Sequence, residues 1–403
     1  MSLVEENPQP TEAAIAADAS FRNAGVLTVA AGHAAHDTYS GFLPVLLPSL
    51  VERFALSNTQ AGWLSTFTQI PSILQPVFGH LADRLALRWI VILAPAVTAT
   101  LMSLAGWAPT YVVLALLLAT VGVSSAAFHA VGSATAGRLS VQHLGRGLSL
   151  WMVGGELGAA LGPIIVAGAL ALHTIKGLAW LMVLGWAASF LLYRQLSRAH
   201  LHPVAAADRP RLRHSLGRMR RVMLLMGALV VLRAMATTAP WVFAPLFLKE
   251  EGSGGFVAGA AVALFLAAGM AGTLGAGWIS DRVGRRAVLL FGVLAGPTGL
   301  LLFTLLHGWA RFPFLALAGA ALVSLHPMCM ALVQEAFPES RGLANAIYLS
   351  TAFVISSGAA VVVGALGDSM GLRGAFVVSA LVAFLSVPLI LVLPGKRKVE
   401  VRA

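Results

Sequence analysis

A short polar cluster interrupts the first long apolar segment of the chain. His33, His36 and Asp37 lie within a run of apolar and small residues from about Ala24 to Leu50. A run of that length is enough to cross a bilayer as a helix. In a helix, His33 shares one face with both His36 and Asp37. A histidine beside a carboxylate can exchange protons with a water-filled cavity, so the cluster is either a proton or substrate site or a polar group that packs neighbouring helices.

Two further charged residues lie inside apolar segments, where a charge is costly unless it is paired or functional. Of the 16 Asp and Glu residues, only Asp37 and Glu156 fall well within such segments. We expect Glu156 to be a second proton site, or else to lie near the membrane edge and reach toward water. Arg233 carries a permanent charge, so its burial requires an anion. That anion is either a carboxylate such as Asp37 or the carboxylate or phosphonate of a substrate.

The composition is that of a membrane protein with many spans. Of the 403 residues, 58% are hydrophobic and only 11% are charged, against about a quarter charged in soluble domains. Helices are the expected spanning elements, because the alternating pattern of a membrane barrel is absent. The single cysteine, Cys329, excludes an internal disulfide and a cysteine-based metal site. The first twenty residues lack the apolar core of a signal peptide.

The apolar segments predict an all-α membrane protein with twelve transmembrane helices in two pseudo-symmetric six-helix bundles. The segments are 24–51, 58–82, 89–107, 110–137, 147–172, 176–194, 221–248, 255–280, 287–307, 311–336, 342–366 and 373–393. The expected organisation is a disordered cytosolic tail (1–22), an N-terminal bundle (23–194), a cytosolic linker (195–220), a C-terminal bundle (221–394) and a basic cytosolic tail (395–403).

The basic residues predict the orientation of the chain. With the N-terminus inside, most of them fall on the inner side, and the linker is especially rich in arginine. The outer side has only Arg53, Lys176, Lys249, Arg311 and Arg373. This bias predicts that both termini lie in the cytosol. Because the basic residues cluster at span ends, the net charge of +11 does not indicate binding to nucleic acid.

The two halves of the sequence repeat at a nearly constant offset. The matching positions are Gly79 and Gly277, Asp83 and Asp281, Arg88 and Arg286, His129 and His326, and Arg146 and Arg341. Two bundles related by an axis along the membrane normal are an arrangement found in transporters, with the substrate site between the halves.

Over essentially its whole length the chain resembles the major facilitator superfamily. The superfamily's Gly-x-x-x-Asp-Arg-x-Gly-Arg-Arg signature is complete from Gly277 to Arg286 and degraded in the first half, where Ala86 and Leu87 replace a glycine and a basic residue. Within the superfamily the chain is similar to the fosmidomycin resistance protein family. The similar stretches are His33-x-x-His36-Asp37, Gln75-Pro76-x-x-Gly79, Phe128-His129 and Gln334-Glu335-x-x-Pro338.

The resemblance implies a latch on the cytosolic side. Asp83 would accept hydrogen bonds from Arg138, or from the start of the helix near Gly342, only when that side is closed. Asp281 is its counterpart in the second half. The other residues assigned to the latch are Arg84, Arg282 and Arg286. Alternatively, these charges only mark the edge of the membrane.

Small residues form a stripe in the fifth apolar segment. Gly154, Gly158 and Gly162 recur every four residues, and Pro163, which bends a helix, follows them. The stripe predicts close packing against another helix. It also resembles the antiporter motif of the superfamily's drug exporters, and this resemblance favours export.

Three residues remain open to two interpretations. His129 and His326 are either packing residues or line the cavity, and Tyr39 belongs either to an interfacial aromatic belt or to a substrate pocket. A metal site formed by the first cluster alone is weakly supported, because all its ligands would come from one helix. We therefore expect no metal and no cofactor.

Together these features predict a monomeric inner-membrane transporter that uses the proton gradient to export small anionic or amphipathic drugs or metabolites. No ATP-binding Walker motif is present. Protonation of Asp37, with His33 or His36 as relay, would change the charge facing Arg233, so that substrate and proton compete and are exchanged. The alternative is an organic-anion symporter that drives uptake. An enzyme or a receptor would need a nucleophile–base pair or a sensing domain, and neither is visible.

Overall fold

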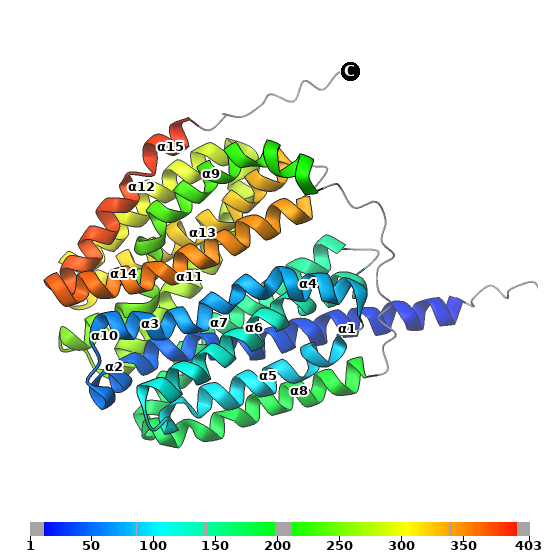
Figure 1. Cartoon of the computed structure of the whole chain (residues 1–403), viewed down its shortest axis with the longest axis horizontal. Coiled ribbons are helices and arrows are strands. Elements are labelled where there is room, and N and C mark those ends of the chain that lie inside the picture. Colours follow the sequence, from blue (N-terminus) through cyan, green and yellow to red (C-terminus); the bar gives the residue numbers. More distant parts are fainter. Residues whose placement is uncertain (1–11, 86, 141–143, 198–211, 338–340, 393–403) are drawn as a thin grey trace, which may run out of the picture.

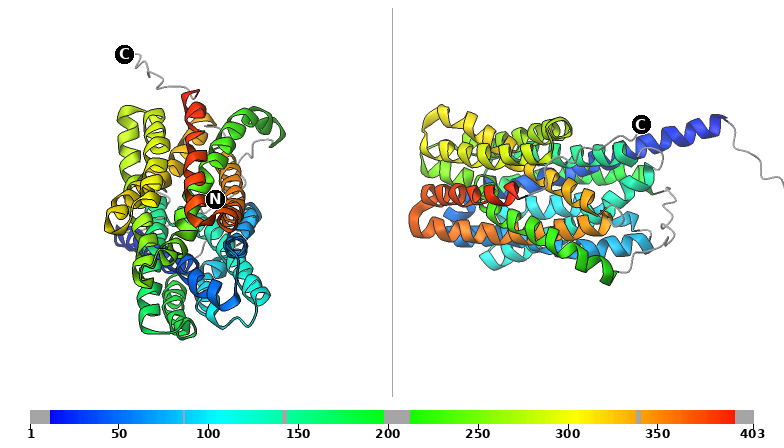
Figure 2. Two further views of the ribbon diagram at one scale, coloured as in Figure 1. Left: turned by 90° about the vertical axis from the view of Figure 1, so that its left-hand side faces the viewer. Right: turned by 90° about the horizontal axis from the view of Figure 1, so that it is seen from above.

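Long apolar segments cannot leave backbone polar groups unpaired in lipid, so they fold into helices. The computed structural model describes residues 12–85, 87–140, 144–197, 212–337 and 341–392, and within these ranges it contains helices and turns but no strands. The helices run roughly along the long axis of the molecule in two bundles that lie side by side (Figures 1 and 2). The first bundle holds α1 to α8, and the second holds α9 to α15.

In the first bundle, two of the predicted spans are each built from a pair of helices joined by a short 3-10 turn. These pairs are α1 (Glu12–Thr38) with α2 (Phe42–Phe54), joined at Tyr39–Gly41, and α3 (Asn58–Gln69) with α4 (Gln75–Arg84), joined at Ile70–Leu74. The remaining helices are α5 (Arg88–Ser103), α6 (Tyr111–Leu139), α7 (Leu144–Leu172) and α8 (Met182–Leu196).

The second bundle also contains interrupted helices. Its elements are α9 (Leu212–Thr238), α10 (Ala244–Glu250), α11 (Gly255–Val283), α12 (Arg285–Leu305), α13 (Phe312–Ala336), α14 (Arg341–Phe384) and α15 (Val387–Leu391). A π-helical turn that contains Pro240 joins α9 to α10. Within α14, Gly371 has φ 77° and ψ 157°, a conformation open to glycine but not to other residues, and the helical path breaks there.

Two helices begin inside segments predicted to be a disordered tail and a linker. Helix α1 starts at Glu12, within the expected tail 1–22, and its first turns are rich in alanine, the strongest helix former. Helix α9 starts at Leu212, within the expected linker 195–220. The rest of the N-terminal tail, residues 198–211 of the linker and the tail 395–403 lie outside the described residues.

Nine of the described helical segments are long and apolar enough to cross a membrane. One of them, Ile347–Leu391, has 45 residues and contains the break at Gly371. This is about twice the length that one crossing needs. The pairs α1–α2 and α3–α4 are not among the nine. Twelve crossings therefore remain a prediction.

The two bundles meet at the end of the molecule that holds α2, α10 and the start of α3, here called the α2 end (left in Figure 1). There the side chain of Asp368 in α14 accepts hydrogen bonds from the backbone N–H groups of Asn58 and Thr59, at 2.6 and 2.9 Å. Farther along, Thr66 donates to the carbonyl of Ser357 at 2.6 Å. The first bundle therefore binds α14 at a helix N-terminus, where a carboxylate is favoured.

Small residues bring the bundle backbones into contact at the α2 end. A Cβ on Gly62 of α3 would collide with the carbonyl of Ala360 in α14, and a Cβ on Gly364 would collide with that of Asn58. Side chains at either glycine would push α3 and α14 apart. Close contact of this kind is the usual way in which helices associate in lipid.

At the opposite end, here called the linker end because α8 ends and α9 begins there, the described polar contacts stay within one bundle. Arg138 of α6 donates to the carbonyl of Ala82 in α4. Arg285 pairs with Glu335 at 3.2 Å within the second bundle. The hydrogen bonds that join described residues of the two bundles, from Thr66 to Ser357, from Asn58 and Thr59 to Asp368 and from Lys249 to Glu52, lie between Thr66 and the α2 end.

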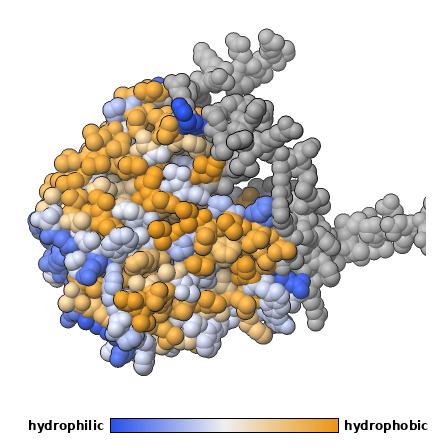
Figure 3. Space-filling model, in the orientation of Figure 1, coloured by the Kyte–Doolittle hydropathy of each residue, from blue (hydrophilic) through white to orange (hydrophobic). Residues whose placement is uncertain are grey.

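Apolar side chains cover much of the outer surface, as Figure 3 shows for one face. Large apolar residues are exposed on both bundles, among them Leu172 at 81%, Leu224 at 66% and Trp309 at 77%. An apolar exterior on this scale fits a lipid environment rather than water.

Candidate functional site

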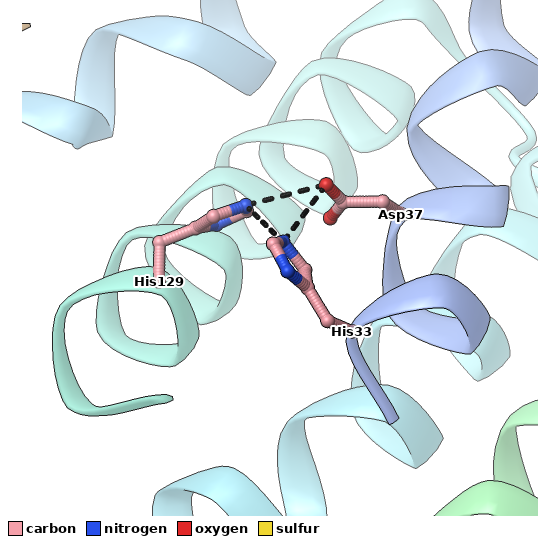
Figure 4. A group of neighbouring side chains, drawn as sticks. All are labelled: His33, Asp37 and His129. Atoms are coloured by element: carbon pink, nitrogen blue, oxygen red, sulfur yellow. Dashed lines mark hydrogen bonds and ion pairs between the residues drawn. The ribbon is translucent and has the colours of Figure 1, made fainter. Parts of the chain in front are cut away.

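The polar cluster of α1 acquires a member from another helix. His33 and Asp37 lie one turn apart on α1, and α6 places His129 against both (Figure 4). Nε2 of His33 lies 3.1 Å from Oδ2 of Asp37, and Nε2 of His129 lies 3.4 Å from the same oxygen. The two Nε2 atoms are 3.2 Å apart. Three side-chain atoms thus converge on one point inside the first bundle.

Backbone carbonyls orient both rings. Nδ1 of His33 donates to the carbonyl oxygen of Trp151 at 2.7 Å, and Nδ1 of His129 donates to that of Ser125 at 2.8 Å. A carbonyl oxygen only accepts hydrogen bonds, so each Nδ1 carries the hydrogen. In the neutral rings both Nε2 atoms are therefore acceptors, and they face the carboxylate of Asp37. Three acceptors at this spacing require a proton or another cation between them.

His36 supports the cluster from the other side of Asp37. Its Nδ1 lies 2.9 Å from Oδ1 of Asp37, and its Nε2 lies 3.1 Å from the hydroxyl of Thr98 in α5. The ring stacks on Phe128 at a centroid distance of 4.2 Å. His36 is 1% exposed, so it is a buried positioning residue for Asp37.

Exposure within the cluster increases toward His129. The side chains of His33, Asp37 and His129 are 5%, 15% and 31% exposed. Trp151 stacks on His33 at a centroid distance of 3.8 Å. The buried rings are therefore fixed, and the accessible side of the cluster is formed by Asp37 and His129.

The glycine stripe of α7 packs against α1 within the same bundle. A Cβ on Gly154, Gly158 or Gly162 would collide with the carbonyls of α1 at Ala30, Ala34 and Thr38. The expectation of close packing is thus met, and this packing brings Trp151 to His33. Pro163 lies inside α7 and contacts α1's connecting turn at Gly41. The antiporter role of the stripe stays a prediction.

Glu156 lies on α7 but does not join the cluster. It is partly buried and forms no hydrogen bond or ion pair with any residue that the structure describes. Its neighbour Gly155 is the α7 residue that faces the cluster, where a Cβ would collide with the ring of His33. The proton role predicted for Glu156 has no geometric support here.

A second polar cluster lies in the other bundle around Arg233 of α9. This side chain is 6% exposed, and its Nη2 lies 3.3 Å from Nδ1 of His326 in α13. Guanidinium only donates, so Nδ1 of His326 accepts. The hydroxyl of Tyr348 lies 3.5 Å from the same nitrogen. Within the described ranges, no carboxylate pairs with Arg233, and its buried Nε has no hydrogen-bond partner.

The two clusters occupy equivalent positions in the sequence repeat. The offset between Asp37 and Arg233 differs by one residue from that between His129 and His326. Each bundle therefore places a histidine of the repeat beside a charged residue, His129 beside Asp37 and His326 beside Arg233, and the two charges are opposite. The first bundle presents an anion, and the second presents a cation.

Tyr39, in the turn between α1 and α2, is held inside the first bundle by two hydrogen bonds. Tyr39 is 1% exposed, and its hydroxyl donates to the carbonyl of Leu181 at 2.7 Å and accepts from the N–H of Gly185 at 3.1 Å. Leu181 ends the 3-10 turn before α8 and Gly185 lies in α8, so the two bonds hold the turn between α1 and α2 against this part of the bundle. The hydroxyl is thus engaged within the bundle, and the substrate-binding role of Tyr39 stays a prediction.

The latch predicted for the linker end is only partly visible. The side chains of Asp83, Arg84 and Asp281 lie outside the described ones. Arg138 contacts the backbone at Ala82, next to Asp83. The guanidinium of Arg282 lies 3.4 Å above the ring of Trp278. The latch, including Arg286, stays a prediction.

Sequence reasoning missed the contact of Asp368 with α3. The signal that points to it is the capping box formed by Ser57 and Gln60, which marks a helix N-terminus with free N–H groups. Such an N-terminus attracts a carboxylate, but the chain offers several at its span ends.

The family model of the Major Facilitator Superfamily matches residues 29–232 and 226–403. The chain belongs to the major facilitator superfamily. It is therefore a multi-pass membrane protein and a secondary transporter of small molecules, not an enzyme.

Two curated proteins align with nearly all of this superfamily member. The Fosmidomycin resistance protein of Escherichia coli (strain K12) is 26% identical over 416 residues, covering 98% of this chain and 99% of that protein. The Uncharacterized MFS-type transporter YfnC of Bacillus subtilis (strain 168) is 25% identical over 379 residues, covering 91% and 92%.

Solved structures of the superfamily share the fold. The nucleoside transporter NupG superimposes with a TM-score of 0.75 at 14% identity, covering 91% of this chain and 98% of that one. A bacterial homolog of the human lysosomal transporter Spinster, in an inward-facing and unoccupied conformation, gives a TM-score of 0.78 at 13% identity, covering 92% and 96%. At these identities the likeness concerns the fold alone.

Proposed function

We propose that this protein is a proton-coupled antiporter that exports small anionic compounds by alternating access. The observation that carries the proposal is the convergence of Nε2 of His33, Nε2 of His129 and Oδ2 of Asp37 within 3.1 to 3.4 Å. Three acceptors at this spacing repel one another unless a proton lies among them. A site of this kind inside a membrane protein binds and releases protons as its access to water changes.

We assign Arg233 as the residue that binds the anionic group of the substrate. Its buried guanidinium lacks a carboxylate partner in the described part of the chain. An unpaired buried cation is strongly unfavourable, so an anion from solution is the natural partner. A carboxylate, phosphate or phosphonate group fits the planar donor fork of arginine. His326 and Tyr348 border this position and are the further contact residues.

Exchange requires that proton and substrate exclude each other. Without a proton, the acceptors of the His33–Asp37–His129 cluster can take a hydrogen bond from an O–H or N–H group of the substrate, while its anionic end binds Arg233. Protonation of the cluster removes that acceptor and weakens substrate binding. The name of the Escherichia coli relative, a resistance protein, also supports export.

Symport is the second candidate, and the observation that favours it is the negative charge of Asp37 opposite an anion bound at Arg233. An anion at Arg233 is repelled by the carboxylate of Asp37, and protonation of the cluster relieves the repulsion. Proton and anion would then bind together and be taken up together. The two modes differ in the sign of the linkage between proton and substrate binding.

One experiment separates the two modes. Substrate affinity of the purified protein is measured between pH 5.5 and 8, after a screen of small anionic compounds for binding. Antiport predicts that substrate binds more weakly at lower pH and that substrate binding releases protons. Symport predicts that substrate binds more tightly at lower pH and that substrate binding takes up protons. Affinity that does not change with pH in this range would contradict proton coupling in either direction.

The orientation follows from the basic residues. We place the linker end, both termini and segment 195–220 in the cytosol. The bundles are then joined at the outer end, where α14 binds the start of α3 through Asp368. The conformation is inward-facing under this assignment, and outward opening must break that contact.

A further inference from the structure

We propose that His33, Asp37 and His129 form a binding site for a divalent transition-metal ion of the Zn²⁺ type. The proposal concerns the same cluster as the proton site, but it rests on geometry alone and does not require transport. Proton and metal ion are alternative occupants of one position.

The spacing of the three atoms matches a metal centre. Zn²⁺ binds histidine nitrogen and carboxylate oxygen at about 2.0–2.1 Å in a tetrahedral arrangement, so two ligand atoms lie about 3.3–3.4 Å apart. The distances in the cluster are 3.1, 3.2 and 3.4 Å. A metal ion fits among the three atoms with shifts of a few tenths of an ångström. Two histidines and one carboxylate are also the ligand set of known zinc enzymes.

Each of the three ligand side chains also forms a hydrogen bond through an atom that would not bind the metal. These bonds support the site independently of the spacing of the ligand atoms. A metal-binding histidine almost always donates its other ring N–H to a carbonyl or carboxylate, which fixes the tautomer and aims the free nitrogen. Both rings do so here, His33 to Trp151 and His129 to Ser125. The free oxygen of the carboxylate, Oδ1 of Asp37, is held by His36 at 2.9 Å. All three ligands are therefore oriented before any ion binds.

The glycine at position 155 and the exposure of His129 bear on how an ion reaches the cluster. Gly155 of α7 faces the cluster, and a Cβ there would lie 3.0 Å from Oδ2 of Asp37. His129 is the ligand with the most exposed side chain, at 31%. With three protein ligands, the fourth tetrahedral position would be filled by water or by a donor atom of a transported compound, as in metal sites that bind substrate.

The ligands come from two helices, so the ion would join α1 to α6. The second bundle has no counterpart of this metal site, because Arg233 replaces the carboxylate at the equivalent position of the sequence repeat. The site should therefore bind one ion per chain.

The test uses purified full-length protein in detergent, with its affinity tag removed and with chelator treatment beforehand. Titration with Co²⁺ reports ligand geometry through the intense visible absorption of the tetrahedral ion, and calorimetry with Zn²⁺ gives affinity and stoichiometry. We expect one ion per chain and a tetrahedral Co²⁺ spectrum. His129→Ala should abolish the spectrum. His36→Ala should lower Zn²⁺ affinity by about 10–100-fold, the usual effect of losing a second contact.

Two controls keep the result interpretable. His173 is an exposed histidine just after the end of α7, and His173→Ala should bind Co²⁺ like the unaltered protein. Thermal unfolding identifies variants that fail to fold, and His129→Asn serves as a smaller change if His129→Ala unfolds. Absence of Zn²⁺ binding, or unchanged binding in folded His129→Ala and His129→Asn, would overturn the proposal.

The outcome is separable from the proposed function. If the unaltered protein binds the metal ion and Asp37→Asn still transports normally under a pH gradient, the metal site is upheld and the proton site is contradicted. If Asp37→Asn loses transport driven by the pH gradient and the unaltered protein binds no metal ion, the proton site is upheld and the metal site is contradicted.

Discussion

Oδ2 of Asp368 accepts hydrogen bonds from both the backbone N–H and the hydroxyl of Thr59, at 2.9 and 2.5 Å. The two residues belong to different bundles. Asp368 lies on α14, whereas Thr59 lies in the first turn of α3, where N–H groups have no partner within the helix. This contact stabilises closure of the α2 end.

Asp368→Asn should weaken that closure. A charged acceptor at a helix N-terminus contributes about 1–2 kcal/mol, so the balance of conformations should move by about 5- to 30-fold toward opening at the α2 end. The change is measured by labelling a single cysteine introduced near Ser357 in a Cys329→Ala background.

Glu52→Gln is the matched control, because Glu52 and Lys249 also join the bundles at the α2 end but are 78% and 48% exposed. An exposed pair of this kind stabilises little. Equal labelling rates in Asp368→Asn and the unaltered protein would show that the contact does not govern opening.

Arg233→Gln should remove binding of anionic ligands selectively. Truncation of one member of a buried charge pair costs about 2–5 kcal/mol, and the loss should fall on anionic compounds, with little change for neutral ones. Ligand affinity and melting temperature are measured on the same preparations.

Arg233→Lys keeps the charge but loses the planar donor fork, so it should recover part of the affinity. Equal losses for an anionic and a neutral ligand, with a lower melting temperature, would instead make Arg233 a structural residue.

Gly158→Ala should destabilise the first bundle. The added Cβ would meet the carbonyl of Ala34 and force α7 away from α1. Such overpacking costs about 1–3 kcal/mol, and it would also separate Trp151 from His33. The melting temperature should fall.

Gly168→Ala provides the comparison on the same helix, because nothing lies within 4 Å of a Cβ at that position. Alanine is the better helix former, so this variant should be as stable as the unaltered protein or more so. Similar losses in both variants would contradict the packing of the stripe against α1.

Glu251, just after α10, makes the stability depend on pH. Its partial burial would raise the pKa of the carboxyl, but a hydrogen bond and the charge of Arg373, with help from Arg311 and His307, hold the pKa below its ordinary value. Nη2 of Arg373 lies 2.8 Å from both oxygens. A lowered pKa in the folded state means that stabilisation is complete above the unfolded value of about 4.3 and is lost as the pH falls through the folded value.

Glu251→Gln should therefore lower the melting temperature at pH 7, and the difference should vanish below about pH 4. Glu250→Gln is the matched control, since Glu250 forms no ion pair with the described residues. A constant difference between Glu251→Gln and the unaltered protein at all pH values would exclude the charge as its cause.

The sequence predicted the charged members of the site, because a charge in an apolar run is conspicuous. Asp37 and Arg233 stand out in this way, and the repeat points to His129 and His326. The partner of His129 was not predictable, since it depends on the rotation of α6 against α1. The carbonyl of Trp151 was not predictable either, because every residue has one.

Tyr39 and Asp368 show the same limit. Tyr39 is typical of a span end or a pocket, and only its contacts with Leu181 and with Gly185 of α8 show that its hydroxyl is already hydrogen-bonded. Asp368 resembles any other carboxylate at the edge of a span until α14 and α3 are seen in contact. Contacts between distant helices depend on packing geometry, which the hydrophobic pattern does not contain.

In the proposed mechanism, Asp37, with His33 and His129, couples transport to protons. This coupling is tested by measuring substrate uptake into proteoliposomes with and without an imposed pH gradient, for Asp37→Asn and for the unaltered protein. Asn keeps the size of the side chain but cannot hold the proton. The variant should still equilibrate substrate down its own gradient but should not accumulate it when a pH gradient is imposed. Accumulation driven by the pH gradient at the unaltered rate in Asp37→Asn would contradict this coupling.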